Sequence, residues 1–269
     1  MLEGSKGFCG AFTLNITNTK EVLNYISSFQ IHCVVNLASN LIPSSSYEAY
    51  IQERANFISP ISELLDELAN RRVAYIYFSS GGTIYGSSDK FSVNEADPKN
   101  PISYYGLSKL WHEELILNAS RTRGLRYLIL RPSNPFGPMQ NPLKKQGLIA
   151  VAVDRMRKNQ DIEIWGDGLV VRDYIWVGDL TQAIASLLDK DSWNEIYNIG
   201  SGFGYSINEV LSTIQSLLST QSKIVYSPAR IEDVKHIVLD IQKLRTAIEF
   251  YPLELKQGIK LYIQDLDPI

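Results

Sequence analysis

Residues Val73–Gly86 read VAYIYFSSGGTIYG and provide the clearest evidence for the fold. The first part, Val73–Phe78, is a short apolar run that predicts a buried β-strand. Ser79–Gly86 follows at the carboxyl end of that strand and carries several hydroxyl groups. Because open parallel sheets bind their ligands at the carboxyl ends of their strands, we expect this segment to lie at a functional edge of the sheet.

The rest of the chain alternates short apolar runs with helical patterns, which is typical of βαβ units and a mainly parallel sheet. The predicted strands are Ala11–Asn15, Ile31–Leu37, Val73–Phe78, Arg126–Arg131, Ile162–Trp165, Tyr174–Val177, Glu195–Ile199 and Lys223–Tyr226. The predicted helices are Thr19–Phe29, Tyr47–Leu68, Ser103–Ser120, Leu148–Lys158, Asp179–Leu188, Ile207–Leu218, Asp240–Glu249 and Leu255–Leu266. Pro60 falls inside the second helix, where we expect it to cause a kink. The predicted fold class is α/β.

The composition argues against several classes of protein. The chain has 269 residues, 45% hydrophobic and 20% charged, so it is long enough to bury a substantial core. A net charge of -3 provides no basic field that would favour nucleic acid. No apolar run approaches the roughly 18 residues of a membrane span, and the first residues lack a signal-peptide core. Cys9 and Cys33 are too few for a disulfide framework, so we expect reduced thiols in a cytoplasmic protein. The three histidines lack metal-ligand spacing, and no metal site is expected.

Tyr105 and Lys109 lie one turn apart in a predicted helix, so their side chains share a face. A tyrosine has a pKa of about 10, and a neighbouring ammonium favours the phenolate, which makes tyrosine a usable general base. Thr83 or Ser80 is the candidate to hold the hydroxyl group that loses its proton. A tyrosine–lysine pair at this spacing is common, and by itself it indicates only a packed tyrosine beside a solvated lysine. The hydroxyl-rich segment upstream favours the catalytic interpretation.

Several further motifs occur in the order found in one known family. They are Val34–Ser39, Asn56, Ser79–Gly86, the Tyr105/Lys109 pair, Arg131–Gly137, Trp165–Gly168 followed by Val171–Ile175, and Pro228–Val234. From about Asn15 to its C-terminus the chain therefore resembles the extended short-chain dehydrogenase/reductase family, and most of all its nucleotide-sugar epimerases of the UDP-glucose 4-epimerase type. The resemblance implies a Rossmann-like sheet, NAD as the cofactor and a UDP-sugar as the substrate.

The resemblance also implies roles for single residues. Catalysis falls to Tyr105, Lys109, Thr83 and Ser80. The cofactor would contact Leu37, Ala38, Asn56, Ser79, Tyr105 and Lys109. The substrate would contact Asn134, Leu148, Arg172, Arg230 and Asp233. Arginine suits a diphosphate because its planar fork donates two parallel hydrogen bonds. Without the resemblance, each arginine is more simply part of a surface ion pair, such as Arg172 with Asp173.

The segment Gly81–Thr83 narrows the reaction. Dehydratases and decarboxylases of the family carry an acidic residue here, and this chain has none. The leading hypothesis is therefore a 4-epimerase that works through a transient 4-keto sugar. Two alternatives stay open: an NAD(P)H-dependent 4-keto-sugar reductase, and a non-catalytic protein that binds nucleotide sugars. In the epimerase type that the chain resembles, a serine stands at the position of Gly81. The hydroxyl group that would hold the substrate oxygen is therefore expected on Thr83 or Ser80.

The leading strand, glycine turn and helix of such a dinucleotide-binding domain are not evident. Gly4, Gly7 and Gly10 have the spacing G-x-x-G-x-x-G, but the residues around them are too few for the flanking strand and helix. They are either a loop before an incomplete domain or a cofactor cradle that has lost the elements behind it. In both cases we expect exposed strand edges and apolar faces, and weak binding of NAD.

We expect two parts in the chain. Residues 1–135 would form a Rossmann-like domain that lacks its first strand–helix–strand unit, and residues 170–200 would return to it. Residues 136–269 would form a smaller nucleotide-sugar-binding part. The resemblance further implies a homodimer that pairs through the helices Tyr47–Leu68 and Ser103–Ser120.

Overall fold

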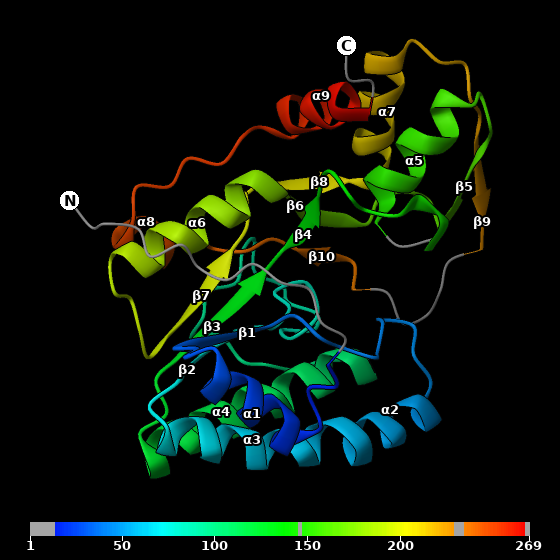
Figure 1. Ribbon diagram of the computed structural model, residues 1–269. Helices are drawn as coiled ribbons and strands as arrows, with labels where there is room; N and C mark the ends of the chain where they lie inside the picture. The colour runs from blue at the N-terminus through cyan, green and yellow to red at the C-terminus, as the bar shows by residue number, and fades with distance from the viewer. Residues whose placement is uncertain (1–13, 145–146, 229–233, 267–269) are drawn as a thin grey trace.

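The computed structural model describes residues 14–144, 147–228 and 234–266. Its centre is a four-stranded parallel sheet in the order β1-β2-β3-β7. The strands are β1 Cys33–Asn36, β2 Ala74–Phe78, β3 Tyr127–Pro132 and β7 Glu195–Ile199. Figure 1 shows helices below and above this sheet, and a second group of helices and short strands at the upper right. The predicted α/β class with mainly parallel strands is confirmed.

Alternate side chains of β2 face two different helical layers. Tyr75 and Tyr77 point into a buried cluster with the helices below the sheet, whereas Ile76 belongs to the cluster above it. The lower helices are α1 Thr19–Ser28, α2 Tyr47–Glu53, α3 Ser59–Asn70 and α4 Tyr104–Arg123. The upper helices are α6 Val177–Asp189 and α8 Gln242–Ala247. The sheet is thus covered on both faces, as its continuous apolar strands predict.

The run predicted as one helix over Tyr47–Leu68 is instead α2, a π-helical turn over Arg54–Ile58, and α3 in unbroken succession. Pro60 accounts for the turn, because proline has no N–H to donate to the carbonyl four residues back and its ring crowds that carbonyl. The N–H of Ser59 reaches one residue further, to the carbonyl of Arg54.

A smaller part lies beside the carboxyl ends of β3 and β7. Its strands are β4 Asn134–Phe136, β5 Ile162–Trp165, β6 Val171–Trp176, β8 Gly204–Ser206, β9 Ile224–Ser227 and β10 His236–Ile237. They form one sheet in the order β10-β6-β4, with β8 antiparallel to β6, and a separate parallel pair of β5 and β9. Its helices are α5 Leu148–Arg157, α7 Ile207–Leu218 and α9 Leu255–Leu266, which share one apolar cluster, and a 3-10 turn covers Pro142–Lys144. β4 follows β3 almost directly, so the two parts meet at the end of β3.

Most predicted elements are confirmed to within a few residues, and the helix Leu255–Leu266 has the predicted bounds. The strands β4, β8 and β10 were not predicted, because elements of two or three residues are too short to produce a periodic pattern. Cys9 and most of the predicted strand Ala11–Asn15 lie outside the described residues. β7 adds to the first sheet after the chain has passed through β4, β5 and β6. The proposed boundary near residue 135 stays a prediction.

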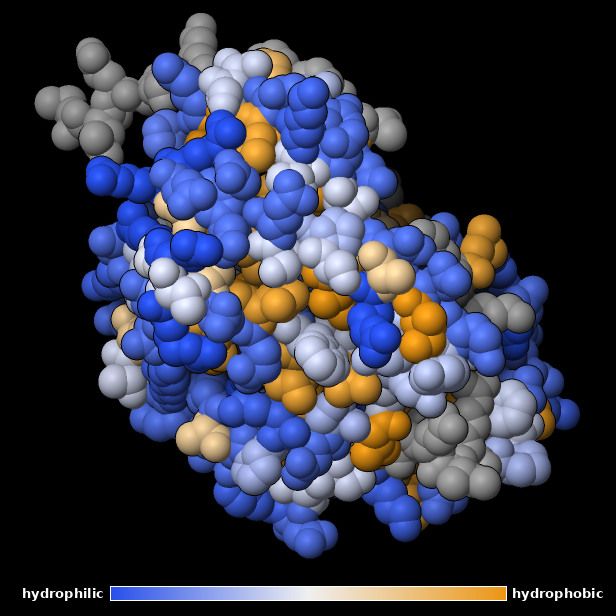
Figure 2. Space-filling model, turned by 90° about the horizontal axis from the view of Figure 1, so that it is seen from below, coloured by the Kyte–Doolittle hydropathy of each residue, from blue (hydrophilic) through white to orange (hydrophobic). Residues whose placement is uncertain are grey.

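β1 lies at an edge of the first sheet, and among the described residues it pairs only with β2. Val35 on this strand and Leu37 just after it are 50% and 64% exposed. Seen from below the lower helices, hydrophilic side chains cover most of the surface and apolar side chains gather near the middle of the face (Figure 2). Within the ranges described, no helix combines the length and the apolar character needed to cross a membrane.

Candidate functional site

Helix α4 places Tyr105 and Lys109 against the loop that follows β2. Ser103 caps the helix, and its Oγ accepts the N–H of Gly106 at 3.1 Å. Gly106 permits a close approach, because a Cβ there would lie 2.9 Å from the carbonyl oxygen of Thr83. Tyr105 is partly buried, and Lys109 is only 4% exposed. The predicted pair is therefore brought together with the hydroxyl-rich loop.

The hydroxyl groups of this loop fall into two kinds. The hydroxyl of Ser80 lies near the phenol of Tyr105 and favours its ionised form. Thr83 Oγ1 and Ser79 Oγ are buried, and neither has a hydrogen-bond partner in the part of the chain that the structure describes. Burying such a group unsatisfied costs about 1–3 kcal/mol. Ser80 thus lies next to Tyr105, whereas Thr83 and Ser79 keep unused hydrogen-bonding capacity.

Lys109 Nζ is held by the strand and by two aromatic rings. It donates to the carbonyl oxygen of Phe78 at 2.8 Å, and it lies 5.0 Å from the ring centroid of Tyr77 and 5.5 Å from that of Tyr105. Burial lowers the pKa of Lys109 to about 8, and the carboxylates of Glu53 and Glu113 partly oppose this. A fraction of Lys109 therefore loses its charge in mildly alkaline solution.

The expected lowering of the Tyr105 pKa is not found. Burial raises the pKa of the phenol, and the hydrogen bond from Ser80 opposes this only in part. The ammonium of Lys109 lies over the face of the Tyr105 ring and donates to Phe78, so it does not compensate for the lost hydration of a phenolate. In this state of the protein Tyr105 carries its proton at neutral pH.

The residues predicted to hold the cofactor are only partly brought together. Ser79, Tyr105 and Lys109 lie at the end of β2, and Leu37 and Ala38 are exposed at the end of the neighbouring strand β1.

Asn56 is not brought to this group, contrary to expectation. It lies within the π-helical turn, its side chain is exposed, and its Nδ2 donates to Gln52 Oε1 at 3.0 Å. The side chain that faces inward is Glu53, which is 3% exposed and interacts electrostatically with Lys109. The resemblance alone pointed to Asn56, and in this structure the side chain is turned outward within the π-helical turn that precedes Pro60.

A cavity of about 420 Å³ contains three of the predicted substrate residues, Asn134, Leu148 and Arg172. They come from β4, α5 and β6, which are far apart in the sequence. Gln140 and Tyr174 also line the cavity and were not singled out from the sequence. No local pattern identifies these two, since each belongs to a short segment whose inward direction depends on the neighbouring part.

Asn134 connects the cavity to the hydroxyl-rich loop. Its Nδ2 donates to the carbonyl oxygen of Asp173 at 2.8 Å, and its Oδ1 would lie 3.8 Å from a Cβ on Gly82. The carboxylate of Asp173 points away and accepts the N–H and Oγ of Ser201, both at 2.8 Å. The simpler assignment of Arg172 to an ion pair with Asp173 is therefore wrong. The Asp173 carboxylate holds the backbone at Ser201, and the Arg172 side chain lines the cavity.

The remaining predicted ligand residues cannot be placed. Arg230 and Asp233 lie outside the described residues, and so do Gly4, Gly7 and Gly10. In the ranges that the structure covers, no group of three His, Cys, Asp or Glu side chains could hold a metal ion.

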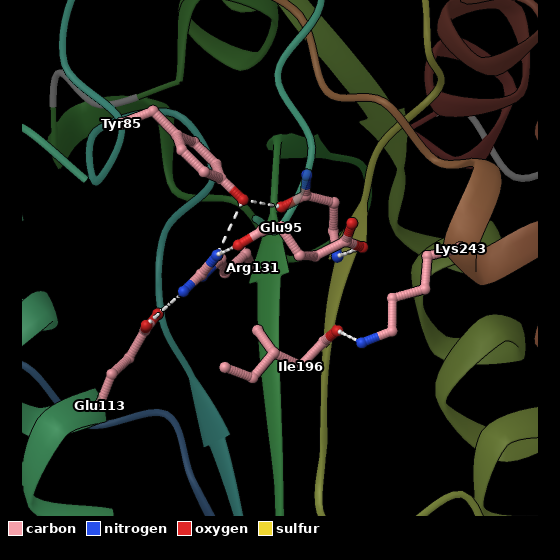
Figure 3. Close-up of polar contacts among 7 residues, drawn as sticks. Tyr85, Glu95, Glu113, Arg131, Ile196 and Lys243 are labelled. Carbon is pink, nitrogen blue, oxygen red and sulfur yellow. Dashed lines mark hydrogen bonds and ion pairs between the residues drawn. The ribbon is translucent and has the colours of Figure 1, made fainter. Parts of the chain in front are cut away.

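Arg131 lies at the centre of a buried polar network that the sequence did not reveal (Figure 3). Its Nε and Nη2 donate to the two carboxylate oxygens of Glu113 at 3.0 and 2.6 Å. Its Nη1 donates to Tyr85 Oη at 2.9 Å and to the carbonyl oxygen of Glu95 at 3.2 Å. Tyr85 in turn donates to Asn198 Oδ1 at 2.6 Å.

This network connects both segments that carry the predicted catalytic residues. Glu113 is on α4, two turns beyond Tyr105, and Tyr85 is two residues beyond Thr83. Arg131 on β3 therefore fixes the helix and the loop to one strand, with bonds in two directions from a single rigid guanidinium.

Gly81 has a steric reason to be glycine. A Cβ at this position would lie 2.9 Å from the carbonyl oxygen of Arg131 and 2.5 Å from Leu239 Cδ1. The serine expected by resemblance cannot occupy this site unless the strand and Leu239 move. The replacement of that serine follows from the close packing of this loop on β3.

Comparison with known proteins gives consistent matches. The model of the NAD dependent epimerase/dehydratase family matches residues 6–200. A putative UDP-glucose 4-epimerase of Methanocaldococcus jannaschii is 34% identical over 242 residues, which cover 90% of this chain and 79% of the relative. A dTDP-4-dehydro-6-deoxyglucose reductase of Escherichia coli is 29% identical over 249 residues, covering 92% and 78%.

Solved structures give the same picture. The UDP-glucose 4-epimerase of Thermotoga maritima, crystallised with UDP-glucose, superposes with a TM-score of 0.89 at 29% identity over 95% of this chain and 83% of that one. The UDP-glucose 4-epimerase of Thermus thermophilus, in complex with NAD, gives a TM-score of 0.85 at 25% identity over 95% and 84%.

Proposed function

Because this chain belongs to the NAD dependent epimerase/dehydratase family, we propose that it is a nucleotide-sugar 4-epimerase that interconverts UDP-hexoses through a transient 4-keto sugar. One observation carries the proposal: helix α4 holds Tyr105 beside the loop that carries Ser80 and Thr83, and the buried hydroxyl of Thr83 has no partner among the described residues. Asn134 connects that loop to the cavity that Arg172 lines. A general base, a hydroxyl-binding group and an anion-binding group are then within reach of one substrate.

The residues at the end of β2 fit the nicotinamide half of NAD. Lys109 provides an ammonium, and Ser79 provides a buried hydroxyl that has no partner among the described residues. A ribose and a carboxamide are groups that such donors satisfy. NAD, when bound, supplies the hydride acceptor of the reaction and returns the hydride.

The side chains of this chain supply the proton transfer. Tyr105 accepts the proton of the sugar 4-hydroxyl and returns it to the 4-keto oxygen. Ser80 orients the phenol, and Thr83 Oγ1 bonds to the same sugar oxygen. Since burial raises the pKa of Tyr105, formation of the phenolate depends on the nearby charge of Lys109. Arg172 and Asn134 hold the diphosphate while the sugar turns, and we assign Leu148 to the sugar pocket and Arg230 and Asp233 to the diphosphate and ribose.

Purified chain supplied with NAD and UDP-galactose should form UDP-glucose without a net change in NADH absorbance. The reason is that an epimerase returns to the sugar the hydride that it removed. Chromatography of the nucleotide sugars and an absorbance trace measure both quantities. Binding of UDP without turnover at saturating NAD would contradict the proposal and favour a non-catalytic nucleotide-sugar-binding protein.

A 4-keto-sugar reductase is the second candidate. The observation that favours it is the similarity to the dTDP-4-dehydro-6-deoxyglucose reductase, which extends over 92% of this chain. A reductase would consume NADH with a 4-keto sugar and would leave UDP-galactose unchanged. The same two measurements therefore distinguish the two enzymes.

Replacing Arg172 by alanine should weaken the binding of UDP roughly 10- to 100-fold, because a hydrogen bond to a charged group contributes about 1.5–3 kcal/mol. Calorimetric titration with UDP measures the effect without turnover. Arg172→Lys should recover part of the affinity, since lysine keeps the charge but lacks the planar fork.

Arg71→Ala is the matched control for this experiment. Arg71 follows α3 and contacts Ser27 and Glu67, on the lower helical layer. Its replacement should leave the affinity for UDP unchanged. Equal affinities of the Arg172→Ala variant and the native chain would show that Arg172 does not bind the diphosphate.

We propose further that the chain pairs as a homodimer through the face of α2, α3 and α4. Three aromatic side chains on this face are exposed in the single chain: Tyr47, Tyr104 and Trp111. Aromatic residues are enriched in protein interfaces, so a second copy packed on this face would bury them. The homodimer and the cytoplasmic location stay predictions.

A further inference from the structure

A second tyrosine lies directly beside the proposed catalytic pair. Tyr77 is on β2, its side chain is buried, and Lys109 Nζ lies 5.0 Å from its ring centroid. The ring of His112, three residues beyond Lys109 on α4, stacks on the same ring with centroids 3.9 Å apart and planes 23° apart. An ammonium within about 6 Å of an aromatic face is attracted by its quadrupole. The mechanism above makes no use of either ring.

A chain of hydrogen bonds fixes His112 in its neutral form. The backbone N–H of Ala38 donates to Asn36 Oδ1 at 2.8 Å, which orients the amide so that its Nδ2 donates to Tyr75 Oη at 2.6 Å. His112 Nε2 lies 3.1 Å from the same hydroxyl, and by donating its proton there Tyr75 avoids leaving a buried O–H unsatisfied. Burial and the charge of Lys109 lower the pKa of His112 to about 3, in agreement with this arrangement. A neutral, immobile imidazole therefore supports the Tyr77 ring and does not repel the ammonium.

The groups around Lys109 come from several elements. Tyr77 and the Phe78 carbonyl lie on β2, Glu53 on α2, and Tyr105, His112 and Glu113 on α4. Glu113 is already engaged by Arg131 in two hydrogen bonds. Without neighbours that favour a cation, burial alone would discharge a lysine.

We propose that Tyr77, supported by His112, is a positioning residue that holds the ammonium of Lys109 in place and charged beside Tyr105. The inference rests on the proposed function only for its consequence, since the proposed mechanism relies on the charge of Lys109 to favour the Tyr105 phenolate. The contact between the Lys109 ammonium and the Tyr77 ring does not depend on a substrate or a cofactor.

The test is an NMR titration of the Lys109 side-chain nitrogen and its neighbouring carbon in isotopically labelled protein, without substrate or cofactor. Lys109→Arg assigns the signal. In Tyr77→Leu, which removes the ring, the pKa of Lys109 should fall by about 0.5–1 unit, the range of a partly buried cation–π contact. In the matched variant Tyr77→Phe, which keeps the ring and removes only the hydroxyl, it should stay close to the native value.

Tyr77→Met refills most of the volume without an aromatic face and decides the question if the leucine variant does not fold. An unchanged Lys109 pKa in the leucine or methionine variant would overturn the proposal. An equal fall in Tyr77→Phe would also overturn it, because the hydroxyl and not the ring would then be responsible.

In an active enzyme the alkaline limb of the kcat profile should move to lower pH in Tyr77→Leu by the same amount, and not in Tyr77→Phe. A merely structural role would lower kcat without moving this limb. If the chain has no epimerase activity, the titration still decides the role of Tyr77, so the two proposals fail independently.

Discussion

Replacing Tyr105 by phenylalanine should lower kcat for the epimerisation of UDP-galactose by about 10²- to 10⁴-fold, the contribution typical of a positioned general base. Phenylalanine keeps the ring whose centroid lies 5.5 Å from Lys109 Nζ but removes the hydroxyl that lies near Ser80. The diphosphate contacts proposed for Arg172 are untouched, so KM should change little. Initial rates of UDP-glucose formation over a range of UDP-galactose concentrations measure both constants.

The adjacent residue provides a matched control. Tyr104 is 38% exposed, and its ring packs on Tyr50 and Tyr47 with centroids 5.3 and 5.5 Å apart. Tyr104→Phe keeps this packing and should leave kcat within about twofold of the native value, as expected for a surface substitution. If the two variants lose the same activity, or if Tyr105→Phe stays active, Tyr105 is not the base.

Replacing Arg131 by alanine should lower the free energy of unfolding by about 3–5 kcal/mol, because the change leaves Glu113 buried without its partner. The side chains of Arg131 and Glu113 are each 1% exposed, so water cannot take the place of the lost contact. Denaturation by urea, followed by circular dichroism, measures the loss. Glu113→Ala should have a similar effect, since it leaves the guanidinium unpaired.

The double variant Arg131→Met/Glu113→Leu tests whether the stability depends on the ion pair itself or only on leaving no unpaired charge in the buried space. It removes both charges and refills the space with apolar atoms, so it should recover most of the stability that either single change loses. Lys158→Ala is the control, because Lys158 forms an exposed pair with Asp154 at 2.8 Å and should contribute less than about 1 kcal/mol. A small loss in Arg131→Ala, comparable with that in Lys158→Ala, would contradict the proposed importance of the network.

Local spacing was enough to predict that Tyr105 and Lys109 share one face of a helix, and the hydroxyl-rich segment upstream then favoured a catalytic role for the pair. Tyr105 and Lys109 are four residues apart in a regular helix, so their common direction follows from helix geometry alone. The position of Ser79 and Ser80 followed in the same way from the apolar run of β2. These predictions did not depend on what the rest of the chain packs against.

The resemblance, and not helix spacing, pointed to Asn56, and the structure leaves this side chain exposed. Pro60 alters the hydrogen bonding of the preceding turn, and the buried side chain at the start of that turn is Glu53. The sequence contained the signal, a proline inside an apolar helical pattern, but not its result. A kink, a break and a π turn all begin from the same missing N–H.

The α/β class, the order of the elements, the Tyr105/Lys109 pair and the hydroxyl-rich loop follow from local patterns of residues, because each depends on residues near one another in the chain. The buried network around Arg131, the raised pKa of Tyr105 and the stack of His112 and Tyr77 near Lys109 are visible only in the folded chain. These features arise where strands and helices from distant segments exclude water. Desolvation and partner choice depend on everything that surrounds a group, and no spacing along the chain specifies them.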